Sequence, residues 1–112
     1  MRDEPKQVDI LQGTLNMMIL QVLGSGPANG YEIAKFIERR SDDLLQIEHG
    51  SLYPALRRLE AKGFIQAEWR VSQTNRRARF YKLTAAGKKQ AIIEHSRWQS
   101  LAEAITRVMR PA

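Results

Sequence analysis

Two runs of strand-forming residues stand next to each other late in the chain, and the other periodic segments have helical spacing. Residues 64–71 and 79–83 are rich in aromatic and β-branched side chains, which favour extended structure. The residues between them, 72–78, are mostly polar and basic, as is typical of an exposed turn. The two runs are therefore predicted to form an antiparallel hairpin.

Four other segments show the three- and four-residue apolar spacing of amphipathic helices. Asp9 and Thr84 are candidate N-caps of the first and the last, and glycines follow the first and the third, where they can end a helix. Residues 44–47 are expected to form a short extended segment. We expect helices at about residues 9–23, 30–40, 49–62 and 84–109.

The order helix, helix, helix, hairpin, helix is that of a winged helix-turn-helix followed by one additional helix. A chain of 112 residues has the usual size of one domain with at most an appended element. The fold is therefore expected to be mainly α with a small β-hairpin. We assign residues 1–84 to a winged helix-turn-helix domain and residues 85–112 to a C-terminal dimerisation helix.

The chain carries 18 Lys and Arg against 12 Asp and Glu, a net charge of +6. Such a balance favours a polyanionic partner, first nucleic acid and second an anionic membrane surface, although excess charge also serves solubility. Five basic residues and no acidic one lie between Arg70 and Lys82, and three of them crowd the predicted turn: Arg76, Arg77 and Arg79. Mutual repulsion among them would be relieved on a phosphate backbone. A solvated charge cluster on an edge strand is the alternative.

The predicted third helix presents a second cationic surface. Its leucines share one face, so the opposite side is left for polar and small residues. Arg57 or Arg58 is expected to bind a guanine edge in the major groove, whereas Ser51, Tyr53 and the helix N-terminus would contact phosphates. A half-buried packing role is the alternative for Tyr53. The candidate DNA-binding residues of this helix are Ser51, Tyr53, Pro54, Arg57 and Arg58.

The last helix carries an apolar seam at intervals of three, four and three residues. A three-helix domain cannot cover that surface, so we expect a second copy to bury it against its own first helix, in a two-fold symmetric homodimer. Two recognition helices would then address half-sites about 10 base pairs apart, or a multiple of that. The candidate dimerisation residues are Leu11, Leu15, Trp98, Leu101, Ile105 and Val108.

The sequence argues against catalysis, metal binding and a cofactor. There is no cysteine, which excludes thiolate chemistry and cysteine-ligated metals. The carboxylates are scattered, His49 and His95 fall on different elements, and no glycine-rich phosphate loop is present. The longest apolar run, residues 17–20, is far short of a membrane span, and the polar N-terminus does not match a signal peptide. A cytoplasmic protein without membrane contact is expected.

Over residues 10–109 the sequence resembles the PadR family of transcriptional regulators. Four blocks in order carry the resemblance, and the third is the most specific: LQGTL at 11–15, GYEIA at 30–34, GSLYPALRRLE at 50–60 and RFYKLTAAG at 79–87. The resemblance implies a recognition helix at 51–62, a wing between Val71 and Phe80, and a dimerisation helix of the short C-terminal type. It also implies repression from an operator with inverted repeats.

Some short members of the family bind flat aromatic compounds at the dimer centre, using a tryptophan of the last helix. The resemblance therefore makes Trp98 a candidate contact for a small aromatic effector, with packing in the seam as the alternative. The function expected from all these features is sequence-specific binding of double-stranded DNA by a homodimeric transcriptional regulator. A winged helix that docks a protein and binds no DNA is the competing hypothesis.

Overall fold

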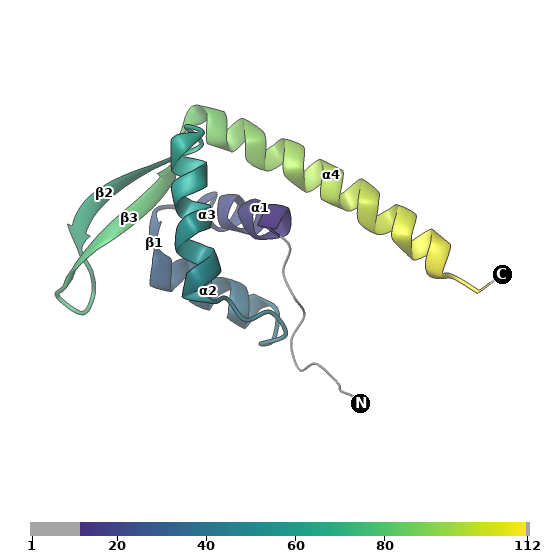
Figure 1. The fold of residues 1–112 in the computed structure, drawn as a ribbon, viewed down its shortest axis with the longest axis horizontal. Coiled ribbons are helices and arrows are strands. Elements are labelled where there is room, and N and C mark those ends of the chain that lie inside the picture. Colours follow the sequence, from purple (N-terminus) through teal and green to yellow (C-terminus); the bar gives the residue numbers. More distant parts are fainter. Residues whose placement is uncertain (1–11, 112) are drawn as a thin grey trace.

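The structure, a computed structural model, describes residues 12–111. A bundle of three helices is followed by a β-hairpin and a long fourth helix (Figure 1). The architecture is the mainly α winged helix-turn-helix with a C-terminal helix that the sequence predicts. In chain order the elements are α1 Gln12–Leu23, β1 Ala28–Asn29, α2 Gly30–Arg40, α3 His49–Ala61, β2 Ile65–Val71, β3 Arg77–Leu83 and α4 Ala85–Met109.

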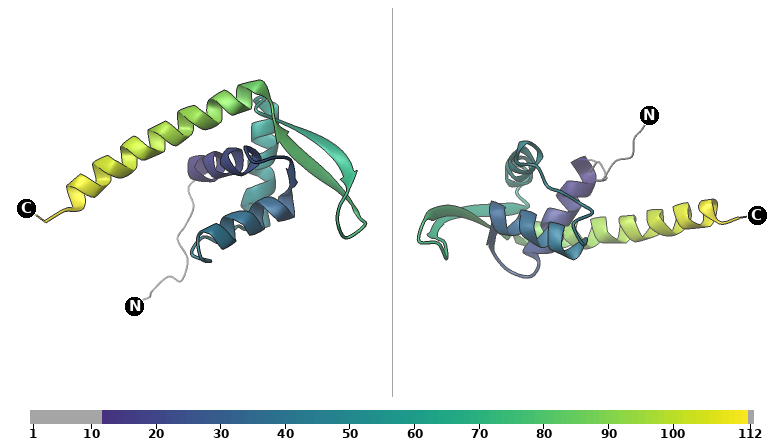
Figure 2. Two further views of the ribbon diagram at one scale, coloured as in Figure 1. Left: turned by 180° about the vertical axis from the view of Figure 1, so that it is seen from behind. Right: turned by 90° about the horizontal axis from the view of Figure 1, so that it is seen from below.

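The first three helices enclose one apolar core. The hairpin leaves this core on one side and α4 on the other (Figures 1 and 2). Ile19, Ile33 and Leu52 contribute one fully buried side chain each from α1, α2 and α3. Complete burial of such a side chain stabilises a fold by about 1.5–3 kcal/mol. Consequently the three helices form a rigid base from which the two outer elements project.

The hairpin belongs to a three-stranded sheet of order β1-β3-β2. β1 pairs antiparallel with β3 by placing Ala28 opposite Tyr81 and Asn29 opposite Phe80. β1 was not predicted, because two residues show no alternation that could distinguish a strand from a loop. The central strand of the sheet is therefore β3, which is held on both edges near the core.

The prediction of an extended segment at residues 44–47 is wrong. These residues form bends and irregular backbone, and within the described chain they pair with no strand. Ile47 is buried in the core. The segment is therefore apolar because this part of the connection between α2 and α3 packs against the core. The predicted N-cap Asp9 lies outside the described residues.

The start of α4 is fastened to the turn that follows α3. The Thr84 N–H donates to the Phe64 carbonyl at 3.1 Å, and the Thr84 hydroxyl donates to the Gly63 carbonyl at 2.6 Å. A Cβ atom at Gly87 would collide with the carbonyl oxygen of Phe64. Glycine at position 87 therefore permits the close approach that sets the direction of α4, which then runs past α1 (Figure 1). None of the helices within residues 12–111 has the length and apolar character needed to cross a membrane.

Gly63 ends α3 in a left-handed conformation, with φ of +79°. Its N–H donates to the Glu60 carbonyl, and the Phe64 N–H donates to the Leu59 carbonyl, both at 3.0 Å. This pair of hydrogen bonds is a Schellman motif, in which glycine avoids the cost that a Cβ atom imposes.

Gly63→Ala should lower the free energy of unfolding by about 1–2 kcal/mol, because an L-residue pays that cost in the left-handed region. A new methyl group would meet no atom within 4 Å. The loss of unfolding free energy therefore measures the cost of the left-handed backbone conformation alone. Urea denaturation at a fixed protein concentration measures it. Gly50→Ala is the matched control: that glycine is helical and equally open, and the change should stabilise by roughly 0.5–1 kcal/mol. Equal stability of Gly63→Ala and wild type would contradict the assignment.

Candidate nucleic-acid interface

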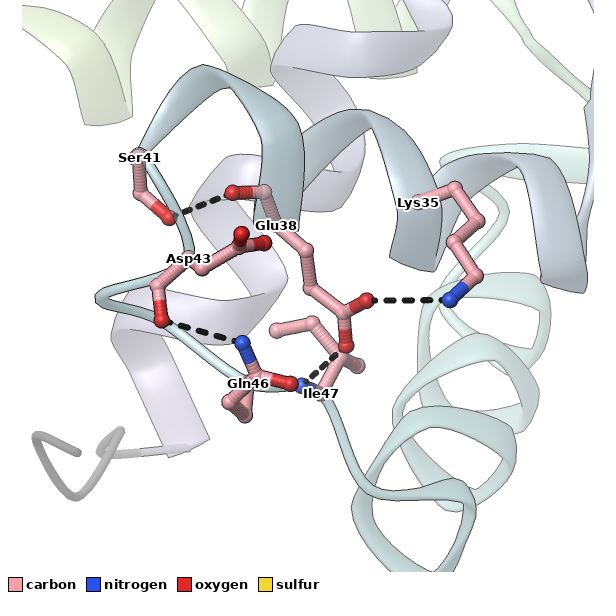
Figure 3. Close-up of polar contacts among 6 residues, drawn as sticks. All are labelled: Lys35, Glu38, Ser41, Asp43, Gln46 and Ile47. Carbon is pink, nitrogen blue, oxygen red and sulfur yellow. Dashed lines mark hydrogen bonds and ion pairs between the residues drawn. The ribbon is translucent and has the colours of Figure 1, made fainter. Parts of the chain in front are cut away.

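The connection between α2 and α3 is organised by the carboxylate of Glu38 (Figure 3). Its Oε2 accepts a hydrogen bond from the Ile47 N–H at 2.9 Å, and its Oε1 lies 3.5 Å from the Lys35 ammonium. The Ser41 hydroxyl donates to the Glu38 carbonyl at 3.1 Å. Only 13% of the Glu38 side chain is exposed. One carboxylate thus links the last turns of α2 to the segment that enters α3.

The turn itself requires unusual backbone angles. Asp42 and Asp43 both have positive φ, 51° and 63°, a region that aspartate tolerates better than most residues. The Gln46 side-chain amide donates to the Asp43 carbonyl at 3.0 Å (Figure 3). These angles reverse the chain within a few residues and bring the start of α3 beside α2.

The beginning of α2 is closed by a capping box. The Asn29 Oδ1 accepts from the Glu32 N–H at 2.8 Å, and the Glu32 Oε1 accepts from the Asn29 N–H at 3.0 Å. Because Asn29 also belongs to β1, this cap fixes α2 relative to the sheet. The carboxylate of Glu32 is thereby occupied by a backbone donor.

The orientation of α3 follows from its leucines. Leu52, Leu56 and Leu59 are at most 2% exposed, so the helix turns Arg57 and Ser51 to the solvent. Tyr53 is partly packed and partly exposed. Its ring contacts Gly30 at the start of α2, while 38% of the residue remains exposed.

Arg58 and Pro54 are less accessible than Arg57. Both are half-buried, and the Arg58 Nε is buried without a hydrogen-bond partner among the described residues. Arg57 is therefore the better candidate of the two arginines for contact with a base.

A concave groove of about 1210 Å³ lies between α2, α3 and the hairpin. We call this groove the wing groove. It brings together four of the predicted DNA-binding arginines and tyrosine Tyr53, whereas Ser51, Pro54 and Arg58 do not line it. Seven of the lining residues are Lys or Arg and one, Glu32, is acidic. The positive lining residues are Lys35, Arg39, Arg40, Arg57, Arg76, Arg77 and Arg79.

Arg79, one of the predicted DNA-binding residues, pairs with an acidic residue of its own chain. Its guanidinium lies 2.9 Å from the carboxylate of Glu60 on α3, and it also stacks 5.9 Å from the ring centre of Tyr81. Both partners of the ion pair are more than a third exposed, so the pair adds little stability. Its effect is geometric, because it ties the wing to α3.

Each face of the hairpin carries one ionisable group with a shifted pKa. On the outer face, the hydrogen bond and the positive charge of Arg70 hold the pKa of the Glu68 carboxyl below its usual range. On the inner face, burial raises the pKa of the Tyr81 phenol. Arg76 and Arg77 have no acidic partner among the described residues. Positive charge without an acidic partner in the described chain is therefore concentrated at Arg76 and Arg77, around the hairpin tip.

Several groove residues lie on α2 and were not among the residues predicted for the site. Tyr31 and Phe36 fit the apolar pattern of α2 but are 62% and 38% exposed, and they line the groove. Lys35 lies 5.6 Å from the Tyr31 ring centre and Arg40 lies 5.5 Å from that of Phe36. The sequence feature that could have indicated these residues is the cluster of basic residues on α2. Helical spacing alone does not show that this cluster faces the wing.

The predicted dimerisation residues separate into three groups. Leu11 lies outside the described residues. Leu15 is 4% exposed in the core of the single chain, so little of its side chain is available to a second copy. The others are exposed on α4: Trp98, Leu101, Ile105 and Val108.

The chain is similar to proteins of a known family. Residues 19–92 match the model of the transcriptional regulator PadR-like family. The chain is 29% identical over 76 residues to the negative transcriptional regulator PadR of Bacillus subtilis, a match that spans 68% of this chain and 42% of that relative.

Two solved structures are similar over most of both chains. A transcriptional regulator from Clostridium thermocellum has a TM-score of 0.80 at 30% identity, covering 88% of this chain and 93% of the other. A PadR family transcription regulator from Clostridium difficile has a TM-score of 0.74 at 28% identity, covering 86% and 98%.

Glu38→Ala should lower the free energy of unfolding by about 1–3 kcal/mol, since it leaves the Ile47 N–H without its acceptor. Glu38→Gln keeps an acceptor oxygen and should lose less. Asp43→Asn serves as control, because the turn uses only backbone atoms of Asp43, its N–H and its carbonyl, and asparagine tolerates positive φ. Thermal and urea unfolding measure all three variants. If Glu38→Ala unfolds like wild type, the carboxylate does not organise the connection.

Proposed function

The chain belongs to the PadR-like family of transcriptional regulators, and from that premise we propose that it regulates transcription by binding duplex DNA as a homodimer. In this proposal α3 enters the major groove and the wing binds the adjacent phosphate backbone. The observation that carries the proposal is the wing groove, where Arg57 of α3 faces the same cavity as Arg76 and Arg77 of the wing.

The division of labour follows from position. Arg57 stands on the exposed side of a helix whose opposite face is buried, so its guanidinium is free to bind the O6 and N7 acceptors of guanine. Arg76 and Arg77 lie at the hairpin tip and would neutralise phosphates, releasing counterions. Lys35 and Arg39 of α2 also line the groove and would hold the same strand.

Dimerisation through α4 is part of the proposal. The exposed apolar residues of this helix continue well beyond the three-helix core, and exposed patches of this kind are typical of interfaces. A two-fold symmetric pair would present two α3 helices to half-sites about 10 base pairs apart, or a multiple of that. In this arrangement residues 85–112 are the dimerisation element and residues 1–84 the DNA-binding domain.

Repression is the expected outcome of binding. The Bacillus subtilis relative is named a negative transcriptional regulator, and a dimer bound at an inverted repeat would act by occupying the operator. Trp98 is 43% exposed on α4, which leaves its indole available for a small aromatic effector or for packing against the second copy.

The double variant Arg76→Ala/Arg77→Ala should weaken binding to all duplexes and reduce the slope of log affinity against log salt by about 2, one unit for each lost phosphate contact. Arg57→Ala should instead relax the preference at particular base pairs, costing about 1–3 kcal/mol at a guanine site. Selection of bound sequences from a random duplex pool, followed by fluorescence anisotropy at several salt concentrations, measures both effects. Undiminished duplex binding by both variants would mean that the assigned surface is wrong, and no binding by wild type would favour a protein-docking role.

Leu101→Asp/Ile105→Asp should convert a dimer into a monomer of 12.9 kDa, because two charges would have to be buried at the seam. Ser96→Asp/Gln99→Asp adds the same charge to exposed positions on the other side of α4 and should leave the dimer intact. Sedimentation equilibrium at micromolar concentration distinguishes the two outcomes. A monomeric wild-type protein would refute this part of the proposal.

A further inference from the structure

The inner face of the hairpin continues from the core into the wing groove. Side chains alternate between the two faces of a strand, so the residues that share a face with the core can be followed outward through the register. The first two cross-strand pairs lie at the core, and the next two extend beyond it: Ile65–Leu83, Ala67–Tyr81, Trp69–Arg79 and Val71–Arg77.

Trp69 and Val71 are therefore apolar residues on a core-facing side that has no core beneath it. Ile65 and Tyr81 are 1% and 5% exposed, whereas Trp69 and Val71 are 59% and 64% exposed. Trp69 also lines the wing groove. A large aromatic side chain kept in water forgoes the stabilisation that its burial would give.

Cations surround Trp69. The Arg77 guanidinium lies 5.1 Å from the centre of its ring, and Arg79 is its direct neighbour on β3. An occupant of this place must offer apolar surface to the indole and negative charge to the arginines. A sugar–phosphate strand offers both, because deoxyribose C–H groups alternate with phosphates.

We propose that Trp69, together with Val71, packs against the deoxyriboses of the DNA strand held in the wing groove, so that the wing binds DNA by an apolar contact framed by arginines. This inference rests on the proposed function, since it requires a duplex in the groove. It assigns to the wing a contribution that does not depend on salt, in addition to the electrostatic one. The seven-to-one excess of basic over acidic lining residues favours DNA over a protein as the occupant.

The test separates apolar from ionic contact by salt dependence. Trp69→Ala should weaken duplex binding roughly tenfold at every salt concentration and leave the salt slope unchanged, because no counterion is released by an apolar contact. Val71→Ala should weaken binding in the same manner but less. Circular dichroism should show an unchanged melting temperature for both, since the two side chains are exposed.

Phe80→Ala is the matched control on the outer face. Phe80 lies opposite Glu68, and Arg70 stacks 5.4 Å from its ring centre. Like Trp69→Ala, this variant removes from the hairpin an aromatic ring that contacts an arginine, but on the other face. Its affinity for the duplex should equal that of wild type. If Phe80→Ala and Trp69→Ala weaken binding equally, general damage to the hairpin explains the loss and the proposal is overturned.

Intrinsic fluorescence gives a second readout. Addition of duplex to wild type should shift the emission to shorter wavelength and reduce quenching by acrylamide. Trp69→Phe, which retains Trp98, should lose both changes. Salt-dependent duplex binding without any change at Trp69, or a reduced salt slope for Trp69→Ala, would overturn the inference and leave the proposed function standing. Absence of duplex binding by wild type would instead refute the proposed function itself.

Discussion

Burial of the leucine face of α3 is the constraint on which the geometry of the wing groove depends. Leu52, Leu56 and Leu59 repeat at the spacing of one helical face, and each is almost fully removed from water. Rotation of α3 about its axis would expose several of them at a cost of about 1.5–3 kcal/mol each. Arg57 is consequently held outward by the energetics of the core, and no contact of its own is needed to orient it.

The same reasoning explains how a hairpin far from the core acquires a defined inner face. β3 is paired on both edges near the core, so its register is fixed there and propagates outward along the strand. A slip by one residue would move Tyr81 from the core to the solvent. The core therefore determines which arginines of the wing face the groove, and the pair of Glu60 and Arg79 reinforces the angle between the wing and α3.

Local patterns predicted most of the fold, and contacts distant in sequence account for what they missed. The end of α3 at Gly63 and the cap at Thr84 depend on neighbours within a turn, so the sequence sufficed for them. The pairing of Glu60 with Arg79, 19 positions away, has no local signal, and neither does the burial of Leu15 within its own chain. The helical spacing of apolar residues in α2 could not show that the wing leaves an open groove beside it, which Phe36 lines. The sequence thus predicted the groove residues that α3 and the wing supply, and it did not predict the basic and aromatic residues that α2 adds to them.

The junction between α3, the wing and α4 connects the wing groove to the exposed apolar surface of α4. Gly63 and Phe64 end α3 and lead into β2, and their carbonyls accept hydrogen bonds from Thr84 at the start of α4. Gly87 then presses the first turn of α4 against the same peptide. In a dimer joined through α4, the position of each α3 relative to its partner would be set at this point. Because the contact is made by backbone atoms at close range, the first turn of α4 cannot tilt without also moving the end of α3 and the base of the wing.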